Sequence, residues 1–263
     1  MFDFDLIGFH TREWCDLFTD YVVSEAQGEL FGHGGLECFG RRVQTGVFPI
    51  GIDVDGFLAA KNSTLGARTY DRMAASAAFR AMIVGVDRLD YSKGLEERLL
   101  GYEQFLQDNP SMRGEVFLLQ VTPISRDDVD SYQDMRARLD ALAGRVNGAF
   151  ADMDWQPIRY LNRTYRRDQL AGIYRAARVG LVTPLRDGMN LVAKEYVATR
   201  NDNRGVLVLS EFAGAAAELK GALLTNPHDP ADLAQTCYLA LNLPKSEAQA
   251  RLRELFDIVC YND

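Results

Sequence analysis

The sequence has little of what a metal site or a disulfide framework requires. Its four cysteines are scattered, without a CxxC pair, and no two of its three histidines stand at helical metal-ligand spacing. Scattered thiols favour a reduced, cytoplasmic protein over a secreted protein held by disulfides. The sequence therefore carries no metal signature.

Other absences exclude whole classes of function. No apolar run reaches the roughly 18 residues of a membrane span, and the net charge of -8 argues against general nucleic-acid binding. The sequence has no G-x-G-x-x-G, no G-x-x-x-x-G-K-[ST] and no G-x-S-x-G. Dinucleotide binding, P-loop hydrolysis and a serine-hydrolase nucleophile are therefore not expected.

From about residue 80, short apolar runs alternate with longer amphipathic ones. We expect strands at 81–86, 116–121, 158–161, 179–183, 206–209 and 222–225. Helices are expected at 95–107, 128–142, 167–177, 191–199 and 212–219, with two more after 225. Strands that alternate with helices predict an α/β fold with a doubly wound, parallel, Rossmann-like sheet. Such a sheet binds ligands beyond the carboxyl ends of its strands.

The first part of the chain has a different pattern. A strand at 5–9 and a helix precede the glycine-rich stretch 28–35, which we interpret as a flexible loop, and a second strand follows at 42–48. Residues 54–79 are typical of a helical connection. We place the domain boundary between 75 and 76, which gives domains 1–75 and 76–263.

The loop after the first strand of the main sheet carries two cations, Arg88 and Lys93, just before a helix. A fork-shaped guanidinium, an ammonium and the free N–H groups of a helix start suit a diphosphate. The alternative is that Arg88 pairs with Asp87 or Asp90 and that Lys93 is a solvated lysine.

The loop that ends near residue 190 suits a sugar. Asp187 can accept hydrogen bonds from hydroxyl groups, Gly188 allows close approach of the backbone, and the amides of 188–192 point to an anion or to hydroxyls. Glu195, one helical turn after Leu191, would face the same cleft. The alternative is a plain turn at Asp187 and a surface position for Glu195.

A third loop places Arg126 before a helix, where it would bind a phosphate or else pair with Asp127 or Asp128. Three such loops at one sheet edge together indicate a phosphorylated sugar-type ligand.

Several runs of residues resemble one known family. Arg88-Leu-Asp-Tyr-Ser-Lys-Gly94 and the 19 residues Val179–Val197 are similar to the signatures of the trehalose-6-phosphate synthases. Further matches are Phe48–Ile52, Val206–Ala215 and Asn226-Pro227. The resemblance implies the GT-B architecture, in which two Rossmann-like domains flank the active site and the C-terminal domain holds the nucleotide sugar. Residues 1–75 would then be the remnant of the acceptor-side domain and the connection.

The resemblance also implies roles for individual residues. Arg88 and Lys93 would contact the donor diphosphate and, with Asp187 on the donor-sugar hydroxyls, would be the catalytic residues. Arg126 would hold the acceptor phosphate. The remaining donor contacts would be the backbone of Gly188, Met189 and Asn190, the amides of Leu191 and Val192, and the carboxylate of Glu195 on the ribose.

The reaction that this resemblance implies transfers glucose from UDP-glucose to glucose 6-phosphate with retention, without a metal or another cofactor. Its partners would be a nucleotide sugar and a sugar phosphate. The sequence leaves open whether the protein forms a homo-oligomer. The family's N-terminal Gly-rich loop and acceptor motifs do not precede Met1, so we expect a truncated chain that is inactive alone. The alternatives are a related synthase with another acceptor, such as glycerol 3-phosphate, or another donor nucleotide, and a non-catalytic or regulatory half-protein that binds a nucleotide sugar.

Overall fold

A computed structural model of the chain describes residues 2–123, 130–200 and 204–262. The chain divides into two compact units, one that ends at Gly51 and one that comprises Ile52–Tyr261. The boundary predicted at 75/76 lies later in the chain than this division. Residues 54–75, predicted as a helical connection, are helical but belong to the second unit. They form α2 (Val54–Asn62) and most of α3 (Thr64–Ala77), and both helices pack against α6 (Arg167–Ala176) of the second unit.

The second unit is built on a six-stranded sheet in the order β10-β9-β8-β5-β6-β7. Every neighbouring pair in this sheet is parallel, which confirms the predicted α/β fold with a parallel sheet. The strands are β5 (Ala81–Val86), β6 (Val116–Val121), β7 (Ile158–Leu161), β8 (Val179–Val182), β9 (Val206–Ser210) and β10 (Leu223–Thr225).

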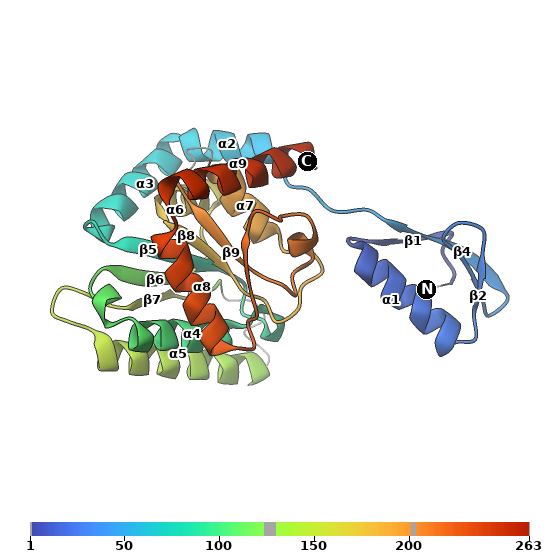
Figure 1. Ribbon diagram of the computed structural model, residues 1–263, viewed down its shortest axis with the longest axis horizontal. Coiled ribbons are helices and arrows are strands. Elements are labelled where there is room, and N and C mark those ends of the chain that lie inside the picture. The colour runs from blue at the N-terminus through green and yellow to red at the C-terminus, as the bar shows by residue number, and fades with distance from the viewer. Residues whose placement is uncertain (1, 124–129, 201–203, 263) are drawn as a thin grey trace. The chain divides into compact units, whose positions relative to one another are not determined.

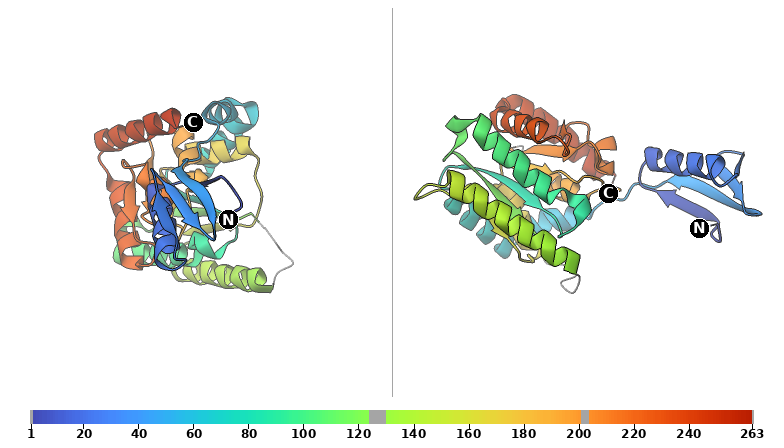
Figure 2. Two further views of the ribbon diagram at one scale, coloured as in Figure 1. Left: turned by 90° about the vertical axis from the view of Figure 1, so that its right-hand side faces the viewer. Right: turned by 90° about the horizontal axis from the view of Figure 1, so that it is seen from below.

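Helices cover both faces of this sheet (Figures 1 and 2). One face carries α2, α3, α6, α7 (Leu191–Thr199) and α9 (Lys245–Tyr261). The other carries α4 (Leu95–Asp108), α5 (Asp130–Phe150) and α8 (Pro230–Asn242). Short 3-10 turns are η1 (Tyr91–Lys93), η2 (Pro110–Met112) and η3 (Gly214–Ala217). None of the helices in these described ranges is long and apolar enough to span a membrane.

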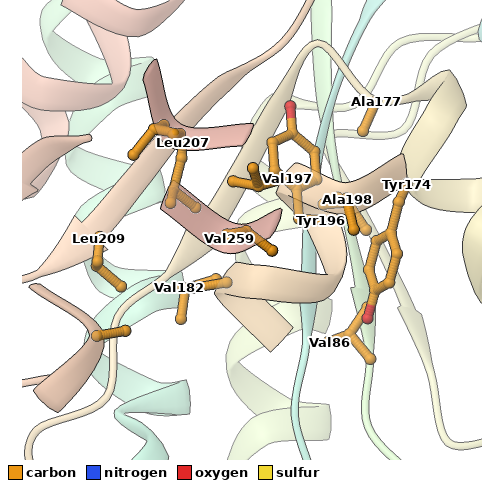
Figure 3. Close-up of a cluster of buried hydrophobic side chains, with 14 of the residues drawn as sticks. Val86, Tyr174, Ala177, Val182, Tyr196, Val197, Ala198, Leu207, Leu209 and Val259 are labelled. Atoms are coloured by element: carbon orange, nitrogen blue, oxygen red, sulfur yellow. The ribbon is translucent and has the colours of Figure 1, made fainter. Parts of the chain in front are cut away.

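The strands of the sheet are apolar on both faces because each face has its own core. Successive side chains of a strand point to opposite faces. In β9, Leu207 and Leu209 join the core beneath α7 and α9, and Val206 and Val208 join the core beneath α4 and α8. Figure 3 shows the first of these cores, where Leu207 and Leu209 lie with Val182, Val197 and Val259.

The first unit is a smaller sheet in the order β1-β4-β3-β2, with a parallel β1–β4 pair and two antiparallel pairs. Its elements are β1 (Leu6–Phe9), α1 (Arg12–Ser24), β2 (Glu29–Phe31), β3 (Gly35–Cys38) and β4 (Arg41–Val47). The stretch 28–35, expected as a flexible loop, instead contributes the β2–β3 hairpin. Gly32 and Gly34 permit its tight turn because both adopt positive φ, at 54° and 77°.

The core of the first unit is small, and large apolar side chains stay exposed. Val22, Leu36, Cys38 and Val43 form the buried cluster. We expect exposed apolar side chains around Phe2, Phe4, Leu6 and Phe48, and the last three are 68%, 53% and 55% exposed. Phe2, expected with them, packs partly against the buried cluster.

Two helices of the second unit differ from their predicted extent. The segment 212–219 forms only the short η3, because its backbone bonds to the loop before α7: Gly214 N–H donates to Asp187 O (2.9 Å) and Ala215 N–H to Met189 O (2.7 Å). Helix α5 continues to Phe150, past the predicted end at 142, because Ala143 and Val146 extend its buried stripe.

Close packing of α3 on α6 depends on Gly172. A Cβ at this position would lie 2.5 Å from Gly66 O and 2.8 Å from the Thr69 Cβ. We predict that Gly172→Ala lowers the free energy of unfolding by about 1–3 kcal/mol, the usual cost of overpacking. Urea denaturation of the purified chain measures this change.

Gly144 is the matched control, since it lies in α5 with no atom within 4 Å of a built Cβ. Gly144→Ala should raise the free energy of unfolding by up to about 1 kcal/mol, because alanine favours the helix. Equal effects of the two substitutions would contradict the packing argument.

Candidate functional site

The parallel sheet brings the loops after β5 and β8 to the same edge, and hydrogen bonds join them. The Ser92 carbonyl, in the first loop, accepts from Leu185 N–H (2.8 Å) and Arg186 N–H (3.3 Å), in the second. The third predicted loop follows β6, and its residues 124–129 lie outside the described residues. Arg126, the predicted acceptor-phosphate ligand, belongs to that segment.

The first loop is shaped by Asp90 and Gly94. The Asp90 carboxylate accepts from Ser92 N–H (2.9 Å) and Ser92 Oγ–H (2.8 Å), which closes the turn that becomes η1. Partial burial raises the pKa of Asp90, but these two hydrogen bonds and the charges of Lys93 and Arg88 together lower it, so the pKa lies below its ordinary value. Gly94 adopts a left-handed conformation with φ at 62°, and a Cβ there would lie 2.5 Å from Thr183 O. The turn therefore fits closely against the end of β8.

Lys93 and Asp187, predicted as donor ligands from two separate loops, are in direct contact. Lys93 Nζ lies 2.5 Å from Asp187 Oδ2, and the two side chains are 15% and 16% exposed. Asn190 Nδ2 donates to the same carboxylate oxygen at 3.1 Å. An ammonium has three N–H donors, so Lys93 can hold Asp187 and still donate to a phosphate oxygen.

Backbone bonds to the chain after β9 hold the second loop in place. Asp187 N–H donates to Phe212 O (3.2 Å), and Asp187 O and Met189 O accept from Gly214 and Ala215. The Met189 side chain is buried in the core, so only the backbone of this residue can face a ligand. Gly188 lies between these two anchored residues.

Helix α7 begins directly after this loop. Asn190 caps it: with φ at 77°, its side-chain oxygen accepts from Ala193 N–H at 3.2 Å. The N–H groups of Leu191 and Val192 belong to the first turn, which has no intrahelical acceptor. These two amides and the positive end of the helix dipole suit an anion.

Arg88 is exposed and weakly paired. Its side chain is 61% exposed, and Nη2 lies 3.9 Å from Asp90 Oδ2. An exposed pair at this distance contributes little to stability, so it leaves the guanidinium free to rearrange toward a ligand. Of the two alternative pairings expected from the sequence, the structure shows the one with Asp90. Asp87 is buried and pairs with Arg98 instead.

Glu195 is not a surface residue. It is half-buried, and the Tyr174 hydroxyl donates to its Oε2 at 3.3 Å. Burial raises the pKa of Glu195 above its ordinary value. A partly desolvated carboxylate with an oxygen left for further hydrogen bonds is a suitable acceptor for sugar hydroxyls.

Sequence reasoning missed Arg98, which lies directly beneath this site. The guanidinium is fully buried and contacts Asp87 (2.6 Å), Thr183 (2.9 Å) and Gln120 (3.0 Å). A signal was present, because Arg98 follows Leu95 by three residues and so falls on the apolar stripe of α4. A cation on a buried stripe requires a buried anion nearby.

The model of glycosyltransferase family 20 matches residues 1–263. The chain belongs to glycosyltransferase family 20.

Two relatives illustrate the similarity of this chain to synthases of different names. A trehalose-6-phosphate synthase of Sinorhizobium fredii (strain NBRC 101917 / NGR234) is 45% identical over 261 residues, 99% of this chain and 56% of the relative. A glucosylglycerol-phosphate synthase of Pseudomonas anguilliseptica is 48% identical over 225 residues, 85% of this chain and 30% of the relative.

Among solved structures, an α,α-trehalose-phosphate synthase (UDP-forming) from Burkholderia xenovorans, in complex with glucose-6-phosphate, superposes with a TM-score of 0.95 at 44% identity. This match covers 100% of the chain and 58% of that structure. The family-20 chain thus has the GT-B fold type. It spans 56% and 58% of the two trehalose-phosphate synthases and 30% of the glucosylglycerol-phosphate synthase. Within the described residues, no group of three or more His, Cys, Asp or Glu side chains could hold a metal ion. Independence of a metal stays a prediction.

The fit of Gly94 against β8 leads to a test. Gly94→Ala should lower the free energy of unfolding by more than the roughly 1–2 kcal/mol cost of a left-handed alanine, because the Cβ also meets Thr183 O. Gly114 is the control, since its φ is 82° but no atom lies within 4 Å of a built Cβ. Urea denaturation compares the two, and an equal loss would show that the contact with β8 does not constrain the turn.

The buried carboxylate of Glu195 predicts a pH dependence. Because the pKa of Glu195 is raised above 4.5 in the folded protein, the folded protein binds this proton more readily than the unfolded chain does. The protein therefore loses stability as the pH rises through the raised pKa and Glu195 becomes charged. Glu195→Gln should therefore stabilise the protein at pH 8, and the gain should shrink as pH falls toward 4.5. Unfolding free energies from pH 5 to 8 test this, with Glu254→Gln, at an exposed position of α9, as the control. A gain that does not vary with pH would contradict the assignment.

Proposed function

We propose that this chain is the nucleotide-sugar-binding part of a trehalose-6-phosphate synthase, which transfers glucose from UDP-glucose to glucose 6-phosphate with retention. The observation that carries the proposal is the cluster of Lys93, Asp187 and Asn190 beside the first turn of α7. Cation, carboxylate, amide and free N–H groups converge there from two loops.

The diphosphate of the donor would lie between Arg88, Lys93 and the start of α7. Two cations and the amides of Leu191 and Val192 supply positive potential where negative charge develops as the donor bond breaks. No metal is invoked, because these groups serve the role that a divalent cation serves in other transferases. The proposal assigns no other cofactor.

The sugars of the donor would be held by the two carboxylates. Asp187, fixed by Lys93 and Asn190, would accept hydrogen bonds from hydroxyls of the glucose, and the backbone of 188–190 would line the same space. Glu195, oriented by Tyr174, would accept from the ribose hydroxyls.

In the reaction, the bond between the anomeric carbon and the diphosphate oxygen breaks. A bond from the acceptor hydroxyl oxygen forms on the same face of the sugar, and that hydroxyl passes its proton to the departing diphosphate oxygen. The products are trehalose 6-phosphate and UDP. No protein nucleophile takes part, and the enzyme's contribution is to position both substrates and to stabilise the departing charge.

The acceptor is the less constrained half of the proposal. Arg126 would bind the acceptor phosphate, in keeping with the glucose-6-phosphate named for the Burkholderia xenovorans structure. The second candidate is a synthase that glucosylates glycerol 3-phosphate, and the 48% identity to a glucosylglycerol-phosphate synthase favours it. A nucleotide-sugar-binding half-protein without activity is the third.

A cytoplasmic location also belongs to the proposal. It is supported by four free cysteines, of which Cys15, Cys38 and Cys237 are buried.

The donor site is tested by calorimetry of the chain with UDP and UDP-glucose. Arg88→Ala and Lys93→Ala should each weaken binding by roughly 1.5–3 kcal/mol, the value of a hydrogen bond to a charged group. Arg253→Ala, at an exposed position of α9, is the control and should leave affinity unchanged. A folded chain that binds no nucleotide sugar, or variants that bind as well as the control, would contradict the assignment.

Turnover is tested separately by a coupled assay of UDP release with glucose 6-phosphate or glycerol 3-phosphate. We expect binding without detectable turnover by this chain alone. Positioning both reactants contributes roughly 7–11 kcal/mol in favourable cases, and Arg126 alone cannot position an acceptor. Robust formation of trehalose 6-phosphate by this chain would contradict that expectation, and turnover with glycerol 3-phosphate alone would favour the second candidate.

A further inference from the structure

Arg98 is a buried cation that the proposed reaction does not use. It lies on the apolar stripe of α4 with Leu95, Leu99 and Tyr102, and its side chain has no exposed surface. Burying a guanidinium is costly, and a buried ion pair often stabilises a fold no better than apolar residues would. Core stability alone therefore does not explain why an arginine, and not an apolar residue, was acquired here.

The contacts of Arg98 connect three neighbouring strands at their carboxyl ends. Nη1 donates to Asp87 Oδ2 (2.6 Å), just after β5, and to Gln120 Oε1 (3.0 Å), near the end of β6. Nε donates to Thr183 Oγ1 (2.9 Å), just after β8. Since the sheet order is β8-β5-β6, a single planar group spans the edge from which all three loops leave.

The backbone around Arg98 is built to admit it. A Cβ on Gly85 would lie 2.6 Å from Arg98 Nη1 and 2.4 Å from Gln120 Oε1. The guanidinium therefore occupies the space that a side chain at position 85 of β5 would fill. Gln120 is oriented in turn, because its Nε2 donates to Thr122 Oγ1 at 3.2 Å.

The network reaches the donor site through Lys93. Arg98 Nη2 donates to the Lys93 backbone carbonyl at 3.5 Å, and Asp87 lies close enough to feel the charges of both Lys93 and Asp187. Arg98, Asp87, Lys93 and Asp187 thus alternate in sign from the core to the site. Arg98 is bonded on both sides of the Lys93–Asp187 contact, to the backbone carbonyl of Lys93 and to the side chain of Thr183 just after β8.

We infer that Arg98 is a positioning residue for the donor diphosphate, which holds the ends of β5, β6 and β8 so that Lys93 and Asp187 meet. This inference rests on the proposed function. Arg98 touches no substrate and acts only through the residues it holds.

The test compares three variants in the full chain. Arg98→Lys keeps the charge but loses the planar fork. The double variant Asp87→Asn with Arg98→Met removes both buried charges, so no lone carboxylate is left in the core if the first variant fails to fold. Arg145→Lys is the control, because Arg145 forms a forked pair with Glu103 (2.5 and 2.7 Å) between α5 and α4, without any contact to the loops.

The first readout is the ratio of the affinities for UDP and UMP. Loss of a fixed Lys93 should weaken UDP binding roughly tenfold in the Arg98 variants, the lower bound for a hydrogen bond to a charged group. UMP, which lacks the second phosphate, should bind nearly as before. General destabilisation would weaken both nucleotides equally, so an unchanged ratio in both Arg98 variants would overturn the inference.

The second readout needs no ligand. Hydrogen exchange of the Leu185 and Arg186 amides, which donate to Ser92 O, should accelerate several-fold in the Arg98 variants and not in Arg145→Lys. Exchange that matches the unaltered chain would overturn the inference. If the unaltered chain binds no nucleotide, the proposed function fails, while exchange still decides whether Arg98 holds the two loops together.

Discussion

The site depends on the close approach of two loops whose contacting residues, Lys93 and Asp187, are 94 residues apart in sequence. Ser92 O accepts from Leu185 and Arg186, and Gly94 fits against Thr183 without room for a Cβ. The contact of Lys93 with Asp187, and the start of α7 beside it, follow from that approach. A parallel sheet makes such a meeting possible because β5 and β8 are neighbours and end at the same edge.

Much of the second unit could be predicted from sequence, because the two patterns that indicate its strands and its helices are local. Apolar runs of four to six residues with amphipathic segments between them indicate parallel strands and crossover helices, and the strands formed where expected. The segment 212–219 was overestimated as a helix, since bonds to Asp187 and Met189 from distant sequence compete with helical ones. The 28–35 hairpin was missed because glycines are typical of both loops and tight turns.

The site was only partly predictable for a related reason. Loop composition predicted Lys93 and Asp187 as ligands of separate groups, and nothing local in the sequence shows that they contact each other. Nor does it show that Asp187 is fixed from three directions before any ligand arrives. Preorganisation of this kind matters for glycosyl transfer, because groups that are already oriented need not reorganise as charge develops. Glu195 has a different balance, since its burial favours the neutral acid, whereas the proposed binding of ribose hydroxyls would favour the carboxylate.

The space that Gly85 leaves for Arg98 limits the order in which this part of the sequence can change. A side chain at position 85 would collide with Arg98 while the arginine is present. Loss of the arginine would leave the Asp87 carboxylate buried in the core without its cation. Replacement of Asp87 first leaves a buried guanidinium without its anion. Each single substitution at Gly85, Asp87 or Arg98 is therefore unfavourable, although apolar residues at all of these positions together are conceivable. A lineage that acquired this arrangement would tend to retain it even after its reaction had changed, because no single-residue path leads away from it without a loss of stability.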